Sequence, residues 1–178
     1  VIISNELLAT PREETNARLT DSIDLATQVI DLVRSVMTDL RPSGIDDYGL
    51  ESALGSLVEQ FRSRHHLNVQ FENNHLAIPR LDANLELALL RIAQEALFNI
   101  AKHANIKEAT LILRQEEDRI YLAIEDKGAG IKSLQSARRS GHHGMTIMRE
   151  RAEAFGGEFT VTSVHGQGTK IEVRVPVD

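Results

Sequence analysis

An acid and an amide stand one helical turn apart in the middle of the chain, inside an otherwise apolar stretch. Arg91, Glu95, Asn99 and Lys102 follow one another at steps of four, four and three. On a helix these steps place the side chains within one narrow sector. Carboxylate and amide oxygens suit Mg²⁺, which takes its other ligands from phosphate and water. The alternative is a purely structural pairing of Glu95 with Arg91 or Lys102.

A second candidate is an acid at the end of a predicted strand, followed by two glycines. Asp126, Gly128 and Gly130 form the sequence DKGAG with their neighbours. A carboxylate there can accept a hydrogen bond from an exocyclic amino group, and glycine lets the backbone approach a ligand closely. The same pattern is also common in turns that bind nothing.

Two further glycine positions have the chemistry of a phosphate site. Gly144 precedes a predicted helix, and a helix start offers free backbone N–H groups and the positive end of the dipole. Gly166, Gly168 and Thr169 lie in HGQGT, between two predicted strands. The hydroxyl of Thr169 can face a phosphate, although a type I′ hairpin turn would explain this sequence without any ligand.

The elements that must position these residues alternate between apolar helices and short strands, which indicates an α+β fold. A long loop is expected over 127–144, and loops of that length are often functional. The hydrophobic pattern predicts helices over 49–64, 81–104 and 145–155, and strands over 68–73, 109–115, 119–126, 158–164 and 169–175.

A heptad pattern precedes this region. Apolar residues recur at steps of four and three from Leu19 to Leu40, with a second row beside the first, and Pro42 and Gly44 end the pattern. The two rows together form an apolar face that is wide enough for a helix of a four-helix bundle. An ordinary core helix of a monomer is the alternative.

Composition narrows the function further. The 178 residues carry 20 Lys and Arg against 26 Asp and Glu, a net charge of −6, so we expect no nucleic-acid partner and no membrane contact. The absence of Cys excludes disulfides and thiolate chemistry. No apolar run approaches the ~18 residues of a membrane span, and the first residues lack a signal-peptide pattern. We therefore expect a fragment of a longer chain, itself located in the cytoplasm.

Four stretches in this order resemble a known family. They are similar to the N box and three glycine boxes of the Bergerat-type ATP-binding domain shared by sensor histidine kinases, gyrase, a heat-shock chaperone and mismatch-repair ATPases. The segment LRPSGIDDYGLESALGSLVEQF, together with MRERA, resembles the NarL-partnered (nitrate/nitrite-sensor-like) histidine kinases. The four stretches are QEALFNIAKHA (94–104), IEDKGAGI (124–131), HHGMTIMRERAEAFGG (142–157) and GQGT (166–169).

The resemblance implies a two-layer α/β sandwich, with helices on one face of a mixed, mostly antiparallel sheet. It implies that Glu95 is the catalytic residue, which polarises or deprotonates the attacking group, and that Asn99 holds Mg²⁺ on the ATP phosphates. Lys102 and His103 would lie near those phosphates, and Asp126 would accept from the adenine amino group.

The same resemblance assigns the remaining positions around the nucleotide. Gly128 and Gly130 would shape the adenine pocket, and residues 132–143 would form the lid over ATP. His143, Gly144 and Met145 would bind from the start of the following helix, although related kinases often carry Tyr or Gly, and Leu, beside this glycine. Gly168 and Thr169 would contact the nucleotide from the sheet.

The phosphoacceptor of such kinases is a His followed directly by Asp or Glu, and none of the seven His here has that neighbour. We therefore expect the acceptor upstream of Val1, with residues 1–42 as part of the dimerisation region and residues 43–178 as the ATP-binding catalytic domain. The full-length protein would be a homodimer, either cytoplasmic or anchored in the bacterial inner membrane, that phosphorylates a NarL-type response regulator. The alternatives are a degenerate interaction module, or another ATPase or anti-sigma-factor-like kinase of the same superfamily.

Overall fold

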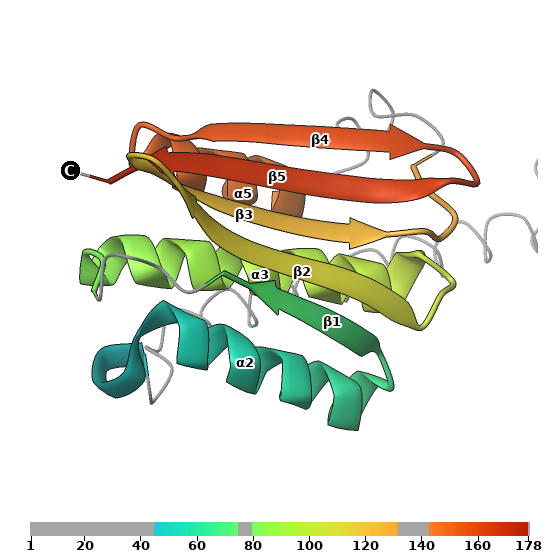
Figure 1. The fold of residues 1–178 in the computed structure, drawn as a ribbon. Coiled ribbons are helices and arrows are strands. Elements are labelled where there is room, and N and C mark those ends of the chain that lie inside the picture. Colours follow the sequence, from blue (N-terminus) through green and yellow to red (C-terminus); the bar gives the residue numbers. More distant parts are fainter. Residues whose placement is uncertain (1–44, 75–79, 132–142, 178) are drawn as a thin grey trace, which may run out of the picture. The chain divides into compact units, whose positions relative to one another are not determined.

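The computed structural model of the protein describes residues 45–74, 80–131 and 143–177 (Figure 1). The predicted heptad helix over 19–40 and most of the predicted lid fall beyond these ranges. The elements are α2 (Ile45–His65), β1 (Asn68–Asn73), α3 (Ala83–His103), β2 (Glu108–Glu116), β3 (Arg119–Asp126), α5 (His143–Glu153), β4 (Glu158–Val164) and β5 (Gly168–Pro176).

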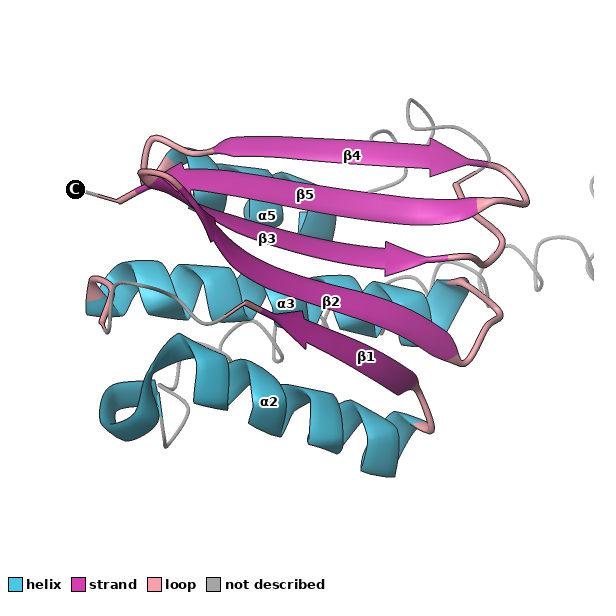
Figure 2. Cartoon of the chain, viewed as in Figure 1, coloured by secondary structure: helices cyan, strands magenta, loops and turns pink. Residues whose placement is uncertain are grey.

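The strands form one mixed sheet of five strands in the order β1, β2, β3, β5, β4. β1 runs parallel to β2, and all other neighbours are antiparallel. Figure 2 shows α3 and α5 on one side of this sheet, while α2 packs against α3 and β1. The predicted two-layer α/β sandwich, with a mostly antiparallel sheet, is confirmed.

The predicted elements match the observed ones closely, and the largest difference is at the start of α2. The helix begins at Ile45 instead of Gly49, and it contains a kink at Gly49, whose φ of 75° separates a short first part from the predicted helix. Glycine tolerates this left-handed conformation at little steric cost. At the other end of the fold, α5 stops at Glu153 and the chain turns through Gly156, whose φ is 68°.

The core lies between the sheet and the helices. Alternate residues of β3 point toward the helices, and Ile120, Leu122 and Ile124 are at most 1% exposed. Because side chains alternate along a strand, Asp126 falls on this same buried face, two residues beyond Ile124. The carboxylate of Asp126 therefore lies at the end of the buried face of β3.

The opposite face of the sheet has a polar cluster built around a tyrosine. Tyr121 is only 2% exposed. The guanidinium groups of Arg114 and Arg174 lie 4.3 and 4.7 Å from its ring centroid, and its hydroxyl donates to Glu172 at 2.7 Å. Burial raises the pKa of Tyr121, and the hydrogen bond to Glu172 adds to this rise. These contacts cover β2, β3 and β5 on the side that no described helix protects.

Within the described ranges, no helix combines the length and the apolar character that crossing a membrane requires.

Leu122→Ala should destabilise the fold by about 2–5 kcal/mol, because it leaves a cavity at a fully buried position. Urea unfolding followed by circular dichroism measures this change. Val164→Ala provides the control, since Val164 is 49% exposed, and it should cost less than about 1 kcal/mol. Equal losses in the two variants would show that the core is placed wrongly.

Candidate functional site

The polar stripe on α3 runs from the interior of the protein to its surface. Arg91 is 7% exposed and donates to Gln94 at 2.8 Å. Glu95 and Asn99 are half-buried, and the amide nitrogen of Asn99 donates to Glu95 Oε1 at 3.3 Å. Lys102 is exposed in the last turn. The stripe therefore contains a half-buried carboxylate and amide that are hydrogen-bonded to each other, and an exposed lysine at the end of the helix.

Both ends of α3 are stabilised locally, which fixes where this stripe emerges. At the start, the carboxylate of Asp82 accepts from the backbone N–H groups of Asn84 and Leu85 at 2.9 and 3.1 Å. At the end, Lys102 and His103 lie in the last turn, where cations interact favourably with the helix dipole. The exposed positions of both residues are set by this helix end.

The start of α5 lies directly against the acid of the stripe. A Cβ atom added at Gly144 would overlap the Oε1 atom of Glu95. A larger residue at this position would displace the end of the Glu95 side chain. The first turn of α5 and the polar stripe of α3 therefore lie side by side.

Asp126 is the most deeply buried acid among the predicted site residues, at 5% exposure. The backbone N–H of Gly128 donates to its Oδ1 atom at 2.7 Å. Burial raises the pKa of Asp126, and backbone hydrogen bonds from Gly128 and Thr169 partly offset that rise. The carboxylate is thus a desolvated acceptor held in place by the turn that follows it.

Gly128 and Gly130 approach the protein's own backbone closely. A Cβ atom at Gly128 would overlap the carbonyl oxygen of Ala104, to which Ala129 N donates at 2.9 Å. At Gly130, where φ is 63°, it would overlap the carbonyl oxygen of Val164. These glycines therefore have a packing role, because they allow the loop after β3 to lie between the end of α3 and the β4–β5 hairpin.

The turn between β4 and β5 is not of type I′, the ligand-free alternative for the sequence HGQGT. Gln167 N donates to Val164 O at 2.9 Å, which closes a four-residue turn. A type I′ turn needs a positive φ at both central residues, and here Gly166 has one, at 77°, whereas His165 does not. A positive φ at the second central residue alone is characteristic of a type II turn.

Gly168 and Thr169 lie beside Asp126 on the neighbouring strand. Thr169 pairs with Asp126 in the β3–β5 register. A Cβ atom at Gly168 would overlap the carbonyl oxygen of Asp126, so glycine is required for β5 to begin this close to β3. The glycine stretch 166–169 therefore contacts the stretch 124–131 at the end of β3.

Met145 is partly buried against the core at the start of α5. The side chain of His143 and the rest of the predicted lid are not covered by the described structure.

The sequence analysis missed Ser163 on β4. Its hydroxyl accepts from Ile131 N at 2.8 Å and lies 3.0 Å from both Gly168 O and Thr169 Oγ1. The sequence does contain one indication of it. Ser163 is a polar residue on the same side of β4 as Phe159 and Val161, which face the helices.

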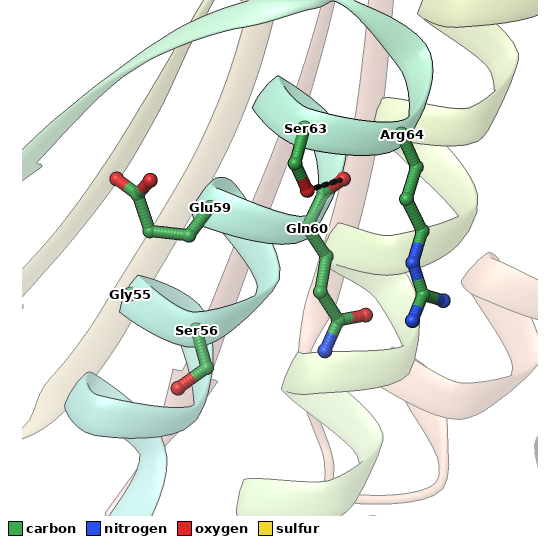
Figure 3. A pocket seen from close by; sticks show the side chains of 6 residues that line it. All are labelled: Gly55, Ser56, Glu59, Gln60, Ser63 and Arg64. Atoms are coloured by element: carbon green, nitrogen blue, oxygen red, sulfur yellow. Dashed lines mark hydrogen bonds between the residues drawn. The ribbon is translucent and has the colours of Figure 1, made fainter.

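A concave surface elsewhere on the molecule contains none of these residues. It lies on α2 and is shown in Figure 3. Its floor holds a local hydrogen bond from the Ser63 hydroxyl to Gln60 O at 3.2 Å. The lining residues are Gly55, Ser56, Glu59, Gln60, Ser63 and Arg64.

The described residues around Asn99 offer few ligands to a metal ion. Across the parts of the chain that the structure describes, no group of three or more His, Cys, Asp or Glu side chains is arranged to hold a metal ion. Asn99 uses its amide nitrogen toward Glu95, while its oxygen makes no hydrogen bond to any described residue. This arrangement fits Mg²⁺, which needs few protein oxygens when phosphates supply the others.

Comparison with known proteins identifies a family and several relatives. The family described as "Histidine kinase-, DNA gyrase B-, and HSP90-like ATPase" matches residues 84–178. The oxygen sensor histidine kinase NreB of Staphylococcus carnosus (strain TM300) is 33% identical over 153 residues, which are 86% of this chain and 44% of NreB. The sensor histidine kinase LiaS of Bacillus subtilis (strain 168) is 34% identical over 145 residues, 82% of this chain and 39% of LiaS. The chain spans less than half the length of these two relatives.

Solved structures share the fold. The histidine kinase domain of a blue-light activated histidine kinase from Erythrobacter litoralis EL346 superposes with a TM-score of 0.59 at 20% identity, covering 72% of this chain and 61% of that chain. A second structure of the same kinase gives a TM-score of 0.64 at 17% identity, covering 98% of this chain and 63% of that one.

The raised pKa of Asp126 predicts a specific pH dependence of stability. A carboxyl group whose folded-state pKa exceeds its unfolded value stabilises the fold below the unfolded pKa, and this stabilisation is lost as pH rises through the folded pKa. Relative to Asp126→Asn, the wild type should therefore lose unfolding free energy between pH about 4, the ordinary value for Asp, and neutral pH. Urea titrations of both proteins across this range measure the difference, and a constant difference would contradict the assignment.

Proposed function

The chain belongs to the family of histidine kinase-, DNA gyrase B- and HSP90-like ATPases, an ATP-binding family, and from this premise we propose that it contains the catalytic domain of a sensor histidine kinase. The proposed domain is residues 43–178, with residues 1–42 as part of the dimerisation region. A division of the chain into the units Val1–Pro42 and Ser43–Asp178 supports this boundary. The similarity to NreB and LiaS, both sensor histidine kinases, favours this branch of the family.

One observation carries the proposal: the half-buried Glu95 and Asn99 pair meets the start of α5 at Gly144. We propose that ATP binds with its phosphates at this junction. Asn99 would hold Mg²⁺ through its amide oxygen, and bound Mg²⁺ would neutralise charge on the phosphates. Lys102 and His103, in the last turn of the same helix, would add positive charge or hydrogen bonds at the rim.

The adenine would bind at the end of β3. Asp126 supplies a desolvated carboxylate acceptor for the exocyclic amino group, and its orientation is fixed by the backbone N–H of Gly128. Gly130 and Gly168 would shape this end of the pocket through their close backbone contacts. Thr169, paired with Asp126, would contact the nucleotide from the sheet, while His143 and Met145 would do so from the start of α5.

In the full-length protein, the γ-phosphoryl group of ATP would pass to a His nitrogen located upstream of Val1. Glu95 would accept the proton that leaves the imidazole, and ADP would depart. Positioning and charge neutralisation contribute most of the catalysis in such phosphoryl transfers. The phosphoryl group would then pass to an Asp of a NarL-type response regulator, with the kinase acting as a homodimer.

Asn99→Ala should weaken binding of a magnesium-bound, non-hydrolysable ATP analogue by about tenfold or more, since it removes a ligand to a charged centre. Isothermal titration calorimetry measures the affinity with magnesium and with EDTA, and the variant should lose most of the difference between these two conditions. Asn84→Ala is the control, because Asn84 is an exposed residue in the first turn of the same helix. Unchanged binding in Asn99→Ala would reject the proposed magnesium site.

The chain should incorporate no phosphate from γ-labelled ATP, because none of its seven His residues precedes Asp or Glu. Acid-labile label on gel-separated protein measures this, and a version of the protein extended upstream to include the proposed acceptor His should become labelled. Label on a His of the present chain would contradict the proposed location of the acceptor.

A further inference from the structure

We propose that Ser163 is a positioning residue of the nucleotide site, which fixes the hydroxyl of Thr169 and the backbone of Ile131. This inference rests on the proposed function and extends it to a residue that does not itself contact the ligand. Ser163 lies on β4, opposite Thr169 in the β4–β5 register.

One hydroxyl makes three contacts. Ser163 Oγ accepts from Ile131 N at 2.8 Å, donates to Gly168 O at 3.0 Å, and lies 3.0 Å from Thr169 Oγ1. The β4–β5 hairpin and the segment that follows β3 therefore meet at this single atom, although Ile131 is 32 residues away from Ser163 in the sequence.

The available protons limit these contacts. A serine hydroxyl has one donor and two acceptor sites. When Ser163 donates to Gly168 O, it can accept from both Ile131 N–H and the Thr169 hydroxyl, which commits the Thr169 proton to Ser163. When Ser163 donates to Thr169 instead, the Thr169 proton becomes free to reach an oxygen of the nucleotide. Ser163 thus sets the direction in which Thr169 donates.

This hydroxyl pair is also linked to the proposed adenine acceptor. Thr169 pairs with Asp126 in the β3–β5 register, and the backbone N–H of Gly128 donates to the Asp126 carboxyl. A displacement of Thr169 would therefore disturb the strand pairing beside Asp126. Ser163 is thus connected to the proposed adenine acceptor through one neighbour.

A purely structural role explains the residue type poorly. Position 163 continues the helix-facing side of β4, where Phe159 is buried and Val161 packs against the core. A β-branched apolar residue fits such a position better than serine does. Burying a hydroxyl costs free energy unless its hydrogen bonds are satisfied, and here two of the three partners, Gly168 and Thr169, belong to the proposed nucleotide site.

An isosteric pair of variants tests the proposal on the 178-residue protein. Ser163→Thr keeps the hydroxyl, and Ser163→Val replaces it with a methyl group of the same shape. Calorimetry with the magnesium-bound ATP analogue should show Ser163→Thr within about twofold of the wild type and Ser163→Val about fivefold weaker, the loss expected for one neutral hydrogen bond. Thr162→Val is the matched control, because Thr162 is exposed on the same strand, and it should bind as the wild type does.

A double-mutant cycle separates positioning from a general loss of structure. If Ser163 acts through Thr169, the double variant Ser163→Val, Thr169→Val should bind no more weakly than the weaker single variant. Urea unfolding of each variant reports stability separately from affinity. Equal affinities of the Thr and Val variants at 163, or fully additive losses in the double variant, would overturn the role of Ser163. A wild type that fails to bind the analogue would instead reject the proposed function itself.

Discussion

At the end of β3 the backbone is so close to its neighbours that side chains are excluded. Gly128 lies against Ala104 O, Gly130 against Val164 O, and Gly168 against Asp126 O. These three contacts join the end of α3, the loop after β3 and the β4–β5 hairpin. The relative positions of Asn99, Asp126 and Thr169 all depend on them, because each of these residues lies on one of the joined segments.

Several polar groups of the site form hydrogen bonds within the protein before any ligand binds, although the amide oxygen of Asn99 forms none to a described residue. Asn99 donates to Glu95, Gly128 donates to Asp126, and Ser163 bridges Ile131 and Gly168. A buried polar group without a partner is costly, so this arrangement stabilises the ligand-free protein. Nucleotide binding would therefore exchange some of these contacts for new ones, and the net affinity would reflect the difference between the two sets.

Much of this fold follows from the sequence because its elements are strongly periodic. The alternation in 119–126 and the apolar face of 81–104 predicted β3 and α3 within two residues of their observed bounds. The stripe on α3 was also evident, since four polar residues interrupt an apolar helix. The start of α2 before Gly49 and the type of the β4–β5 turn were not predicted, because the backbone at each place depends on the φ of one glycine, which composition does not specify. The role of Ser163 was not predicted because its contact with Ile131, 32 residues away in the sequence, forms only by tertiary packing.

The outer face of the sheet gives the protein an internal optical probe. The chain has two Tyr and no Trp, so its intrinsic emission comes from few sources. One of them, Tyr121, is enclosed by Arg114 and Arg174 and hydrogen-bonded to the Glu172 carboxylate, a partner that quenches phenol emission by accepting its proton in the excited state. Separation of β3 from β5 would remove that acceptor and brighten the signal. Tyrosine fluorescence therefore follows the integrity of the central strands from the side remote from α3 and α5.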